Sequence, residues 1–167
     1  MMIRDEAVGD EAAIGDVTAA AFADMPYSDQ TEPQIIERLR TARALTVSLV
    51  AEEAGEIVGH VAFSPVTFPS GAPGWYGLGP VSVKPDRQRQ GIGSALINEG
   101  LRRLKALNAR GCILVGYPDY YKRFGFASCP TLKVEGVSPE YLLALPLRGP
   151  VPSGIVAFHP GFYGDAT

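Results

Sequence analysis

The residues best suited to chemistry in this sequence surround two glycines, Gly91 and Gly93, which follow a polar and basic run. The β-branched segment Val81-Ser82-Val83 precedes that run, and apolar residues recur at helical spacing after it. A strand, a polar loop and a helix are therefore predicted in that order. Glycines at a helix start allow a tight turn and leave backbone N–H groups bare. With Arg87 and Arg89 beside the positive end of the helix dipole, this segment is predicted to bind an anion such as a pyrophosphate.

Spacing excludes two common phosphate-binding loops. A Rossmann fingerprint needs a third glycine three residues after the second, where this sequence has Leu96. A P-loop needs a lysine after its last glycine, and Ser94 follows Gly93 here. The remaining pattern, Gln88-Arg89-Gln90-Gly91-Ile92-Gly93, resembles the Gln/Arg-x-x-Gly-x-Gly/Ala motif of the GNAT superfamily of N-acetyltransferases. A glycine turn that merely opens a surface helix is the alternative that so short a pattern leaves open.

A second motif, Tyr120-Tyr121-Lys122-Arg123-Phe124-Gly125-Phe126, follows the next predicted strand. It resembles the GNAT pattern of an aromatic residue, Tyr, two variable residues, an apolar residue, Gly and Phe. The resemblance assigns Tyr121 as the catalytic residue, whose neutral hydroxyl donates a proton or a strong hydrogen bond to the departing thiolate. A tyrosine that only packs in the core is the alternative. Tyr120 is expected in the core or at the rim of the site.

The resemblance implies an N-acetyltransferase that moves the acetyl group of acetyl-CoA to an amine by direct attack in a ternary complex. Acetyl-CoA would lie between the strands of residues 81–83 and 112–115, which splay apart, and Gly79-Pro80 would form a bulge. Its pantetheine arm would pair with the backbone like an added strand, and an N–H near Val81 would polarise the thioester carbonyl. A non-catalytic module that binds or senses acyl-CoA is the competing hypothesis. The expected cofactor-binding residues are Val81, Ser82, Val83, Gln88, Arg89, Gln90, Gly91, Ile92, Gly93 and Ser94.

The acceptor is expected between the first two predicted helices, where the sequence is acidic. Asp24, Asp29 and Glu32 would suit a cationic amine, on a small molecule or a peptide, although acids on an exposed loop are often only solvated. The aromatic walls expected beside them are Tyr27, Trp75 and Tyr76.

No residue matches a general base by motif. Glu32, Asp29 and His60 are candidates, and a structural role is favoured for His60 and for His159. Lys122 and Arg123 are further candidates for contacts with the cofactor's phosphates.

The composition is that of one soluble globular domain, expected to span residues 1–167. The chain has 46% hydrophobic and 20% charged residues, and its net charge of −3 makes nucleic acid an unfavoured partner. No segment resembles a signal peptide or reaches the length of a membrane span, so a cytoplasmic location without membrane contact is expected by default. The two cysteines and two histidines lack metal-ligand spacing, so no metal is expected. A homodimer is among the assemblies that the resemblance allows.

The hydrophobic pattern predicts the element order βααβββαβαββ, with a hairpin in the first half and one crossover helix. This order matches the GNAT fold, a mixed and mostly antiparallel α/β sheet with splayed central strands and helices on both faces. The expected elements are a strand from Ile3, helices capped by Asp10 and Thr31, strands over 45–52 and 56–67, a strand ending at Val83, a helix closing with Gly111 at its C′ position, a strand over 112–115, a brief helix over 120–124, and final strands over 142–147 and 155–159.

Overall fold

Seven strands of the computed structural model, which describes residues 1–164, form one twisted mixed sheet in the order β1-β2-β3-β4-β5-β8-β6. All neighbouring strands are antiparallel except β4 and β5, which run parallel. A small second sheet pairs β7 with β9. The elements are β1 (Met2–Asp5), α1 (Glu11–Phe22), α2 (Glu32–Thr41), β2 (Val47–Glu53), β3 (Glu56–Pro65), β4 (Trp75–Val83), α3 (Ile92–Ala106), β5 (Gly111–Val115), α4 (Pro118–Tyr121), β6 (Ala127–Ser128), β7 (Leu132–Lys133), β8 (Leu142–Pro146) and β9 (Gly154–Ile155), with short 3-10 turns at Pro85–Arg87, Lys122–Phe124, Pro139–Tyr141 and Pro160–Tyr163.

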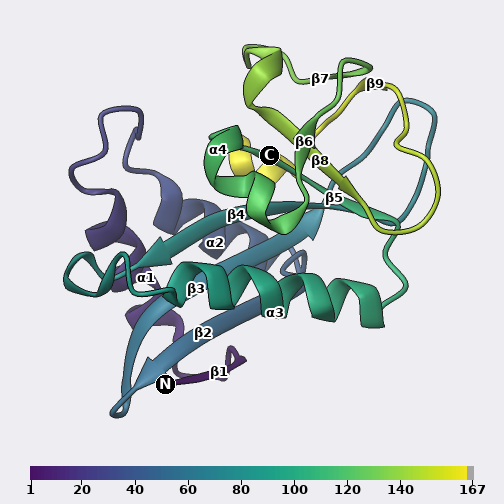
Figure 1. Cartoon of the computed structure of the whole chain (residues 1–167). Coiled ribbons are helices and arrows are strands. Elements are labelled where there is room, and N and C mark those ends of the chain that lie inside the picture. Colours follow the sequence, from purple (N-terminus) through teal and green to yellow (C-terminus); the bar gives the residue numbers. More distant parts are fainter. Residues whose placement is uncertain (165–167) are drawn as a thin grey trace.

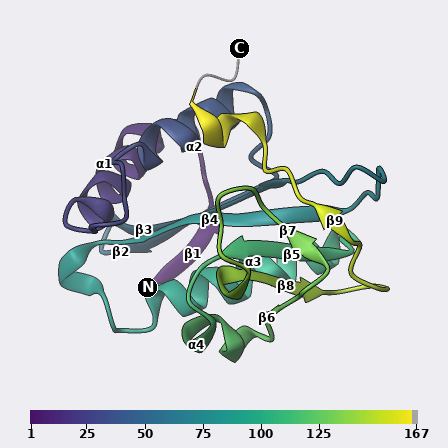
Figure 2. The same ribbon diagram turned by 90° about the horizontal axis from the view of Figure 1, so that it is seen from above.

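Helices cover both faces of the large sheet. Helices α1 and α2 lie on one face and α3 lies on the other, as Figures 1 and 2 show from two directions. The predicted mixed sheet with helices on both sides is therefore confirmed. No helix in the described part of the chain is long and apolar enough to cross a membrane.

The main core fills the space between the sheet and α3. Helix α3 buries one apolar stripe, formed by Ile92, Leu96, Ile97, Leu101 and Leu104, as the helical spacing predicts. Gly100 lets the helix approach the sheet closely, because a Cβ at this position would clash with the ring of Phe63. The helix that begins at the glycine loop is thus held rigidly on β2 and β3.

Strands β4 and β5 pair only along their first residues and then separate. Their parallel register ends at the pair Gly77 and Ile113, while β4 continues to Val83. On the other side of β4, the register with β3 shifts between Val61 and Phe63, opposite Gly79-Pro80. The expected bulge and the expected splay of the central strands are both present, and together they open the middle of the sheet.

A second core lies on the other face of β4, β5 and β8, under the C-terminal part of the chain. Trp75 is buried there against Phe68, with ring centroids 6.0 Å apart in an edge-to-face arrangement. The chain then returns to α2, as Figure 2 shows. There Arg38 Nε donates a 2.8 Å hydrogen bond to the carbonyl of Gly161. This returning segment covers sheet surface that would otherwise be open.

Several local predictions were wrong at the ends of elements. Asp10 and Thr31 occupy the N-cap positions of α1 and α2, but neither side chain caps its helix. Asp10 instead accepts from Ala7 N at 2.7 Å and pairs with Arg4. Asn108, with φ of 60°, takes the left-handed position after α3, and Gly111 begins β5 instead.

The last predicted strand, over 155–159, is much shorter in the structure. Only Gly154–Ile155 pairs as β9, and Ala157 adds one isolated bridge to Thr67. His159 then caps a 3-10 turn, because its Nδ1 accepts from Gly161 N at 3.0 Å. This bond gives His159 the structural role that was favoured for it.

Candidate active site

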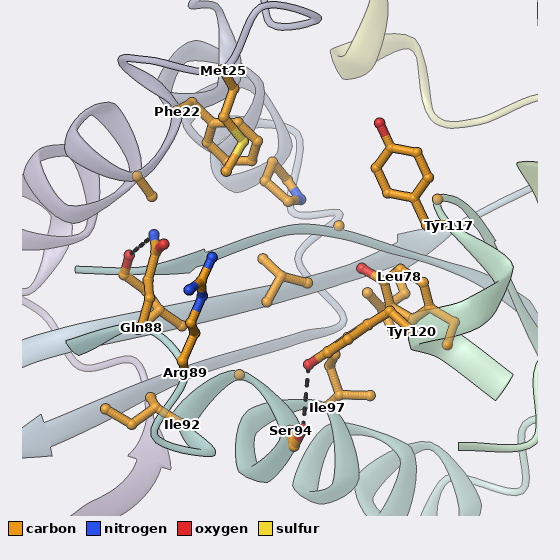
Figure 3. A pocket seen from close by; sticks show the side chains of 18 of the residues that line it. Phe22, Met25, Leu78, Gln88, Arg89, Ile92, Ser94, Ile97, Tyr117 and Tyr120 are labelled. Carbon is orange, nitrogen blue, oxygen red and sulfur yellow. Dashed lines mark hydrogen bonds between the residues drawn. The ribbon is translucent and has the colours of Figure 1, made fainter. Parts of the chain in front are cut away.

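A cleft of about 1030 Å³ opens where β4 and β5 separate. Three parts of the chain build it: the second half of β4, the loop and first turn of α3, and the segment from the end of β5 through α4. The end of α1 and the loop after it close the remaining side. Figure 3 shows Gln88, Arg89 and Ser94 on one side of this cleft, with Phe22, Met25 and Tyr117 across from them.

The backbone of β4 presents a free edge to the cleft. Lys84 N donates to Val58 O at 2.8 Å, and strand N–H and C=O groups alternate between the two neighbouring strands. Ser82 and Lys84 therefore direct their backbone groups to β3, and Val81 and Val83 direct theirs to the side where β5 has diverged. Gln88 Nε2 donates to Val83 O at 3.1 Å, which shows that this carbonyl is available from the cleft side (Figure 3).

The start of α3 supplies a cluster of backbone donors. The first intrahelical bond runs from Ala95 N to Gly91 O at 3.0 Å, so the N–H groups of the three preceding residues have no partner within the helix. Gly91 makes the turn with a left-handed φ of 86°, which favours glycine. Arg87, Arg89 and Arg123 are the charged residues among those that line the cleft in the described part of the chain. The arrangement favours an anion at the helix start.

Two adjacent tyrosines lie across the cleft from β4. The Tyr120 hydroxyl is 3.3 Å from Ser94 Oγ, and the Arg123 guanidinium lies 4.3 Å from the centre of the Tyr120 ring (Figure 3). The Tyr121 ring packs 4.9 Å from that of Tyr120, and a Cβ at Gly116 would come within 2.5 Å of it. Burial raises the pKa of Tyr121 to about 12, so its hydroxyl keeps its proton at neutral pH.

Most of the predicted cofactor-binding residues come together at this cleft. The predicted cofactor-binding and catalytic residues that line it are Val81, Val83, Gln88, Arg89, Gly91, Ile92, Gly93, Ser94 and Tyr121. Gln90 is exposed and does not line it. Neighbouring side chains of a strand point to opposite faces, so the Ser82 side chain points away from the face of Val81 and Val83. It is buried, does not line the cleft, and lies opposite His60 of β3 in the sheet.

The expected acidic acceptor site is not formed. Asp24, Asp29 and Glu32 do not line the cleft. The side chain of Asp29 accepts from Thr31 Oγ1 at 2.6 Å, and that of Glu32 accepts from Ser28 Oγ at 2.7 Å. These carboxylates organise their own loop, so their expected role in holding the acceptor is not supported by the geometry.

The expected aromatic walls are also only partly correct. Of the three residues named, Tyr27 lines the cleft, whereas Trp75 is in the second core and Tyr76 packs against the main core. Sequence reasoning missed Tyr117 and Tyr141, whose rings meet edge to face at 5.8 Å. They follow β5 and precede β8, so recognising these two buried runs as antiparallel neighbours would have found them.

His60, a candidate base in the sequence, is fully buried in β3 away from the cleft lining. Its Nε2 lies 2.8 Å from Ser48 Oγ, which donates to Glu6 at 2.6 Å. Burial lowers the pKa of His60 to about 4, so the ring is neutral at physiological pH. The structural role favoured for it agrees with this position. Of the two phosphate-contact candidates, Arg123 lines the cleft and Lys122 does not.

Among residues 1–164, no three His, Cys, Asp or Glu side chains are grouped to hold a metal ion. Cys112 is buried in β5, and burial raises the pKa of its thiol.

Comparison with known proteins shows the family to which this chain belongs. The model of the acetyltransferase (GNAT) family matches residues 15–126. YhbS of Escherichia coli (strain K12), an uncharacterized N-acetyltransferase, is 34% identical over 101 residues, which are 60% of this chain and 60% of YhbS. The matched region thus spans less than two thirds of that relative.

Solved structures cover nearly the whole chain. A GNAT family acetyltransferase from Brucella melitensis, in complex with acetyl-CoA, is 48% identical with a TM-score of 0.87, covering 96% of this chain and 97% of that one. The structure of YhbS from Escherichia coli in complex with CoA has a TM-score of 0.88 at 27% identity, covering 98% and 92%. With its splayed strands and glycine loop, the chain belongs to the GNAT family of acetyltransferases.

Proposed function

We propose that this protein transfers the acetyl group of acetyl-CoA to a primary amine, by direct attack within a ternary complex. The observation that carries the proposal is that one cleft gathers the free edge of β4, the start of α3 and Tyr121. The similar structures that hold acetyl-CoA and CoA support the choice of co-substrate.

In this proposal the cofactor is held mainly by backbone groups. The pyrophosphate lies against the N–H groups of Ile92, Gly93 and Ser94, where the helix dipole and Arg89 favour negative charge. The pantetheine arm runs along Val81 and Val83 as an added strand, and its amide takes over the bond that Gln88 makes to Val83 O. The N–H of Val81 then polarises the thioester carbonyl.

The reaction forms a bond from the amine nitrogen to the acetyl carbon and breaks the bond from that carbon to sulfur. The proton that the nitrogen loses balances the proton that the sulfur of CoA gains. Among the described residues that line the cleft there is no carboxylate and no imidazole, so the proposal assigns the first deprotonation to water. The rate at low amine concentration should therefore rise with pH until the acceptor amine is itself neutral.

Tyr121 is proposed to stabilise the sulfur as the bond breaks. A free thiol has a pKa of about 8.5, and burial raises the pKa of Tyr121 to about 12. Complete proton transfer from this hydroxyl to a thiolate is therefore uphill, and a short hydrogen bond to the developing charge is its main contribution. Packing against Phe124 and Phe126 holds the ring in place for that role.

A thiol-release assay tests the proposal. Acetyl-CoA is incubated with the protein and a panel of primary amines, and free CoA is measured with a thiol reagent while mass spectrometry identifies the acetylated amine. Amine-dependent CoA release with a matching acetylated product is the expected result. A non-catalytic acyl-CoA-binding module would bind CoA in calorimetry yet release no thiol above the rate of spontaneous hydrolysis with any amine.

A further inference from the structure

Exposed aromatic side chains gather in the part of the cleft formed by the loop after α1 and the residues after β5. Tyr27, Tyr117 and Tyr141 are 66%, 60% and 38% exposed, and all three line this one cavity. Of the exposed tyrosines in the part of the chain that the structure describes, Tyr163 alone lies elsewhere. Large apolar surfaces that stay exposed and grouped mark binding sites more often than scattered ones do.

These aromatic residues form a slot with defined geometry. The Tyr117 and Tyr141 rings meet at 84°, which presents one ring's face and the other's edge. From the opposite side the loop after α1 contributes Met25 and Tyr27, whose hydroxyl lies 2.8 Å from the Met25 sulfur. Phe22 completes this wall, and Figure 3 shows it with Met25 across the cleft from Tyr117. A flat aromatic group is the shape that such faces and edges accommodate best.

The charge of the cleft argues against a polycation. Its charged lining residues, among those described, are three arginines; no carboxylate is among the lining residues, and Arg87 pairs with Glu53 at 3.0 Å. Of the three acids before and at the start of α2, Asp29 and Glu32 accept hydrogen bonds from Thr31 and Ser28, and none of Asp24, Asp29 and Glu32 lines the cleft. A second ammonium group on the acceptor would lose water and meet no carboxylate among the lining residues, which is unfavourable.

We infer that the acceptor is a primary amine attached to an aromatic body and carrying no second positive charge. This inference rests on the proposed acetyl transfer and names its substrate class. The aromatic body occupies the slot between Tyr117, Tyr141 and Met25, which directs the amine toward the thioester beside β4. The same chemistry can come from a free arylalkylamine or from an aromatic residue at a peptide N-terminus.

Competition among matched amines tests the inference. The panel contains phenethylamine, phenylalanine amide, a dipeptide amide with N-terminal phenylalanine, n-butylamine and spermidine, each assayed at fixed acetyl-CoA. Phenethylamine or one of the phenylalanine compounds should exceed both n-butylamine and spermidine in kcat/KM by at least about tenfold. The order of phenethylamine and the dipeptide amide identifies the source of the amine.

Variants of the slot provide the second arm. Tyr117→Ala and Tyr141→Ala should each lower kcat/KM for the best aromatic amine by about tenfold, mainly through KM. The same changes should lower kcat/KM for n-butylamine by a smaller factor than for the aromatic amine, and should leave the KM for acetyl-CoA within about threefold. Tyr163→Ala removes an equally exposed tyrosine outside the cleft and serves as the matched control, with no change expected.

The outcomes distinguish a failure of the aromatic acceptor class from a failure of acetyl transfer itself. Acetylation with spermidine or n-butylamine as the best acceptor, or equal effects of Tyr117→Ala on all amines, would overturn the aromatic class and leave acetyl transfer standing. CoA binding without an acetylated product from any amine would overturn the proposed function itself, and the acceptor inference with it.

Discussion

The two ends of the cleft are built by different means. The end proposed to hold the cofactor, here called the cofactor end, consists of backbone groups. They belong to the free edge of β4 and the first turn of α3, within one continuous stretch of about twenty residues. The acceptor end consists of side chains from α1, its following loop, the end of β5 and the turn before β8. Backbone donors are independent of most substitutions, whereas a wall of side chains changes whenever its residues change.

This difference explains how one architecture can keep its co-substrate and exchange its acceptor. A pyrophosphate needs only N–H groups in a fixed geometry, which the left-handed turn at Gly91 and the anchored α3 provide. The proposed aromatic acceptor needs a wall of matching shape, which Tyr117 and Tyr141 would provide from loops that tolerate variation. Substitutions at the two ends should therefore have separable effects on the two substrates.

The largest effect is expected at Tyr121, where the two ends meet. Tyr121→Phe removes the hydroxyl and keeps the ring that packs under Gly116. We expect kcat to fall by about 10²- to 10⁴-fold because a positioned donor acts as charge develops on sulfur. The KM values of both substrates should change little, and steady-state kinetics on a variant with an unchanged melting temperature checks this.

Tyr120→Phe is the matched control for that variant. It removes the contact between the Tyr120 hydroxyl and Ser94 at the start of α3, so it should affect acetyl-CoA binding more than turnover. If Tyr120→Phe abolishes turnover while Tyr121→Phe keeps it within about threefold, the two roles must be exchanged.

Acid should destabilise the whole fold, because His60 is buried in β3, inside the large sheet. The pKa of His60 is lowered to about 4 by burial, against about 6.5 in an unfolded chain. The stability from this neutral ring is fully present above pH 6.5 and is lost as pH falls toward 4, by on the order of 3 kcal/mol. Urea unfolding at pH 7 and pH 4 should show a smaller loss for His60→Gln than for the parent. An equal loss in both would remove His60 as the cause.

A smaller effect is expected at the glycine turn. Gly91→Ala places a side chain at a φ of 86°, although a Cβ there would contact nothing within 4 Å. Backbone strain alone should lower stability by about 1 kcal/mol. Gly93→Ala is the matched control, since its Cβ would make ordinary contacts at 3.5 Å without a left-handed φ. Thermal unfolding should rank Gly91→Ala below Gly93→Ala, and the reverse order would contradict the strain argument.

More of the residues predicted for the cofactor than of those predicted for the acceptor lie at the cleft. The strand, loop and helix around Gly91 are adjacent along the chain, so local pattern was enough to place Val81, Gly93 and Ser94 at one cleft. Two of the residues predicted for the cofactor, Ser82 and Gln90, do not line the cleft. Ser82 was included because it lies between Val81 and Val83, but strand alternation buries its side chain on the other face of the sheet.

Most residues predicted for the acceptor lie outside the cleft lining, because the walls of the cleft depend on pairings distant in sequence. Trp75 was expected at the site, yet the chain after β8 folds over that face and buries its ring. Tyr117 and Tyr141 meet only because Val115 pairs with Leu142 across β5 and β8. Exposed acids such as Asp29 bond to their own loop, which no periodic pattern distinguishes from substrate binding.

Calorimetric titration with CoA tests directly whether the start of α3 holds the cofactor. Gly93→Asp adds a negative charge where the pyrophosphate is proposed to lie, while a Cβ at this position is tolerated by its neighbours. We expect the parent and Gly93→Ala to bind CoA with affinities within about threefold of each other, and Gly93→Asp to bind at least about tenfold more weakly while remaining folded. Equal CoA affinity of the folded Gly93→Asp variant and the parent would show that the start of α3 does not hold the pyrophosphate.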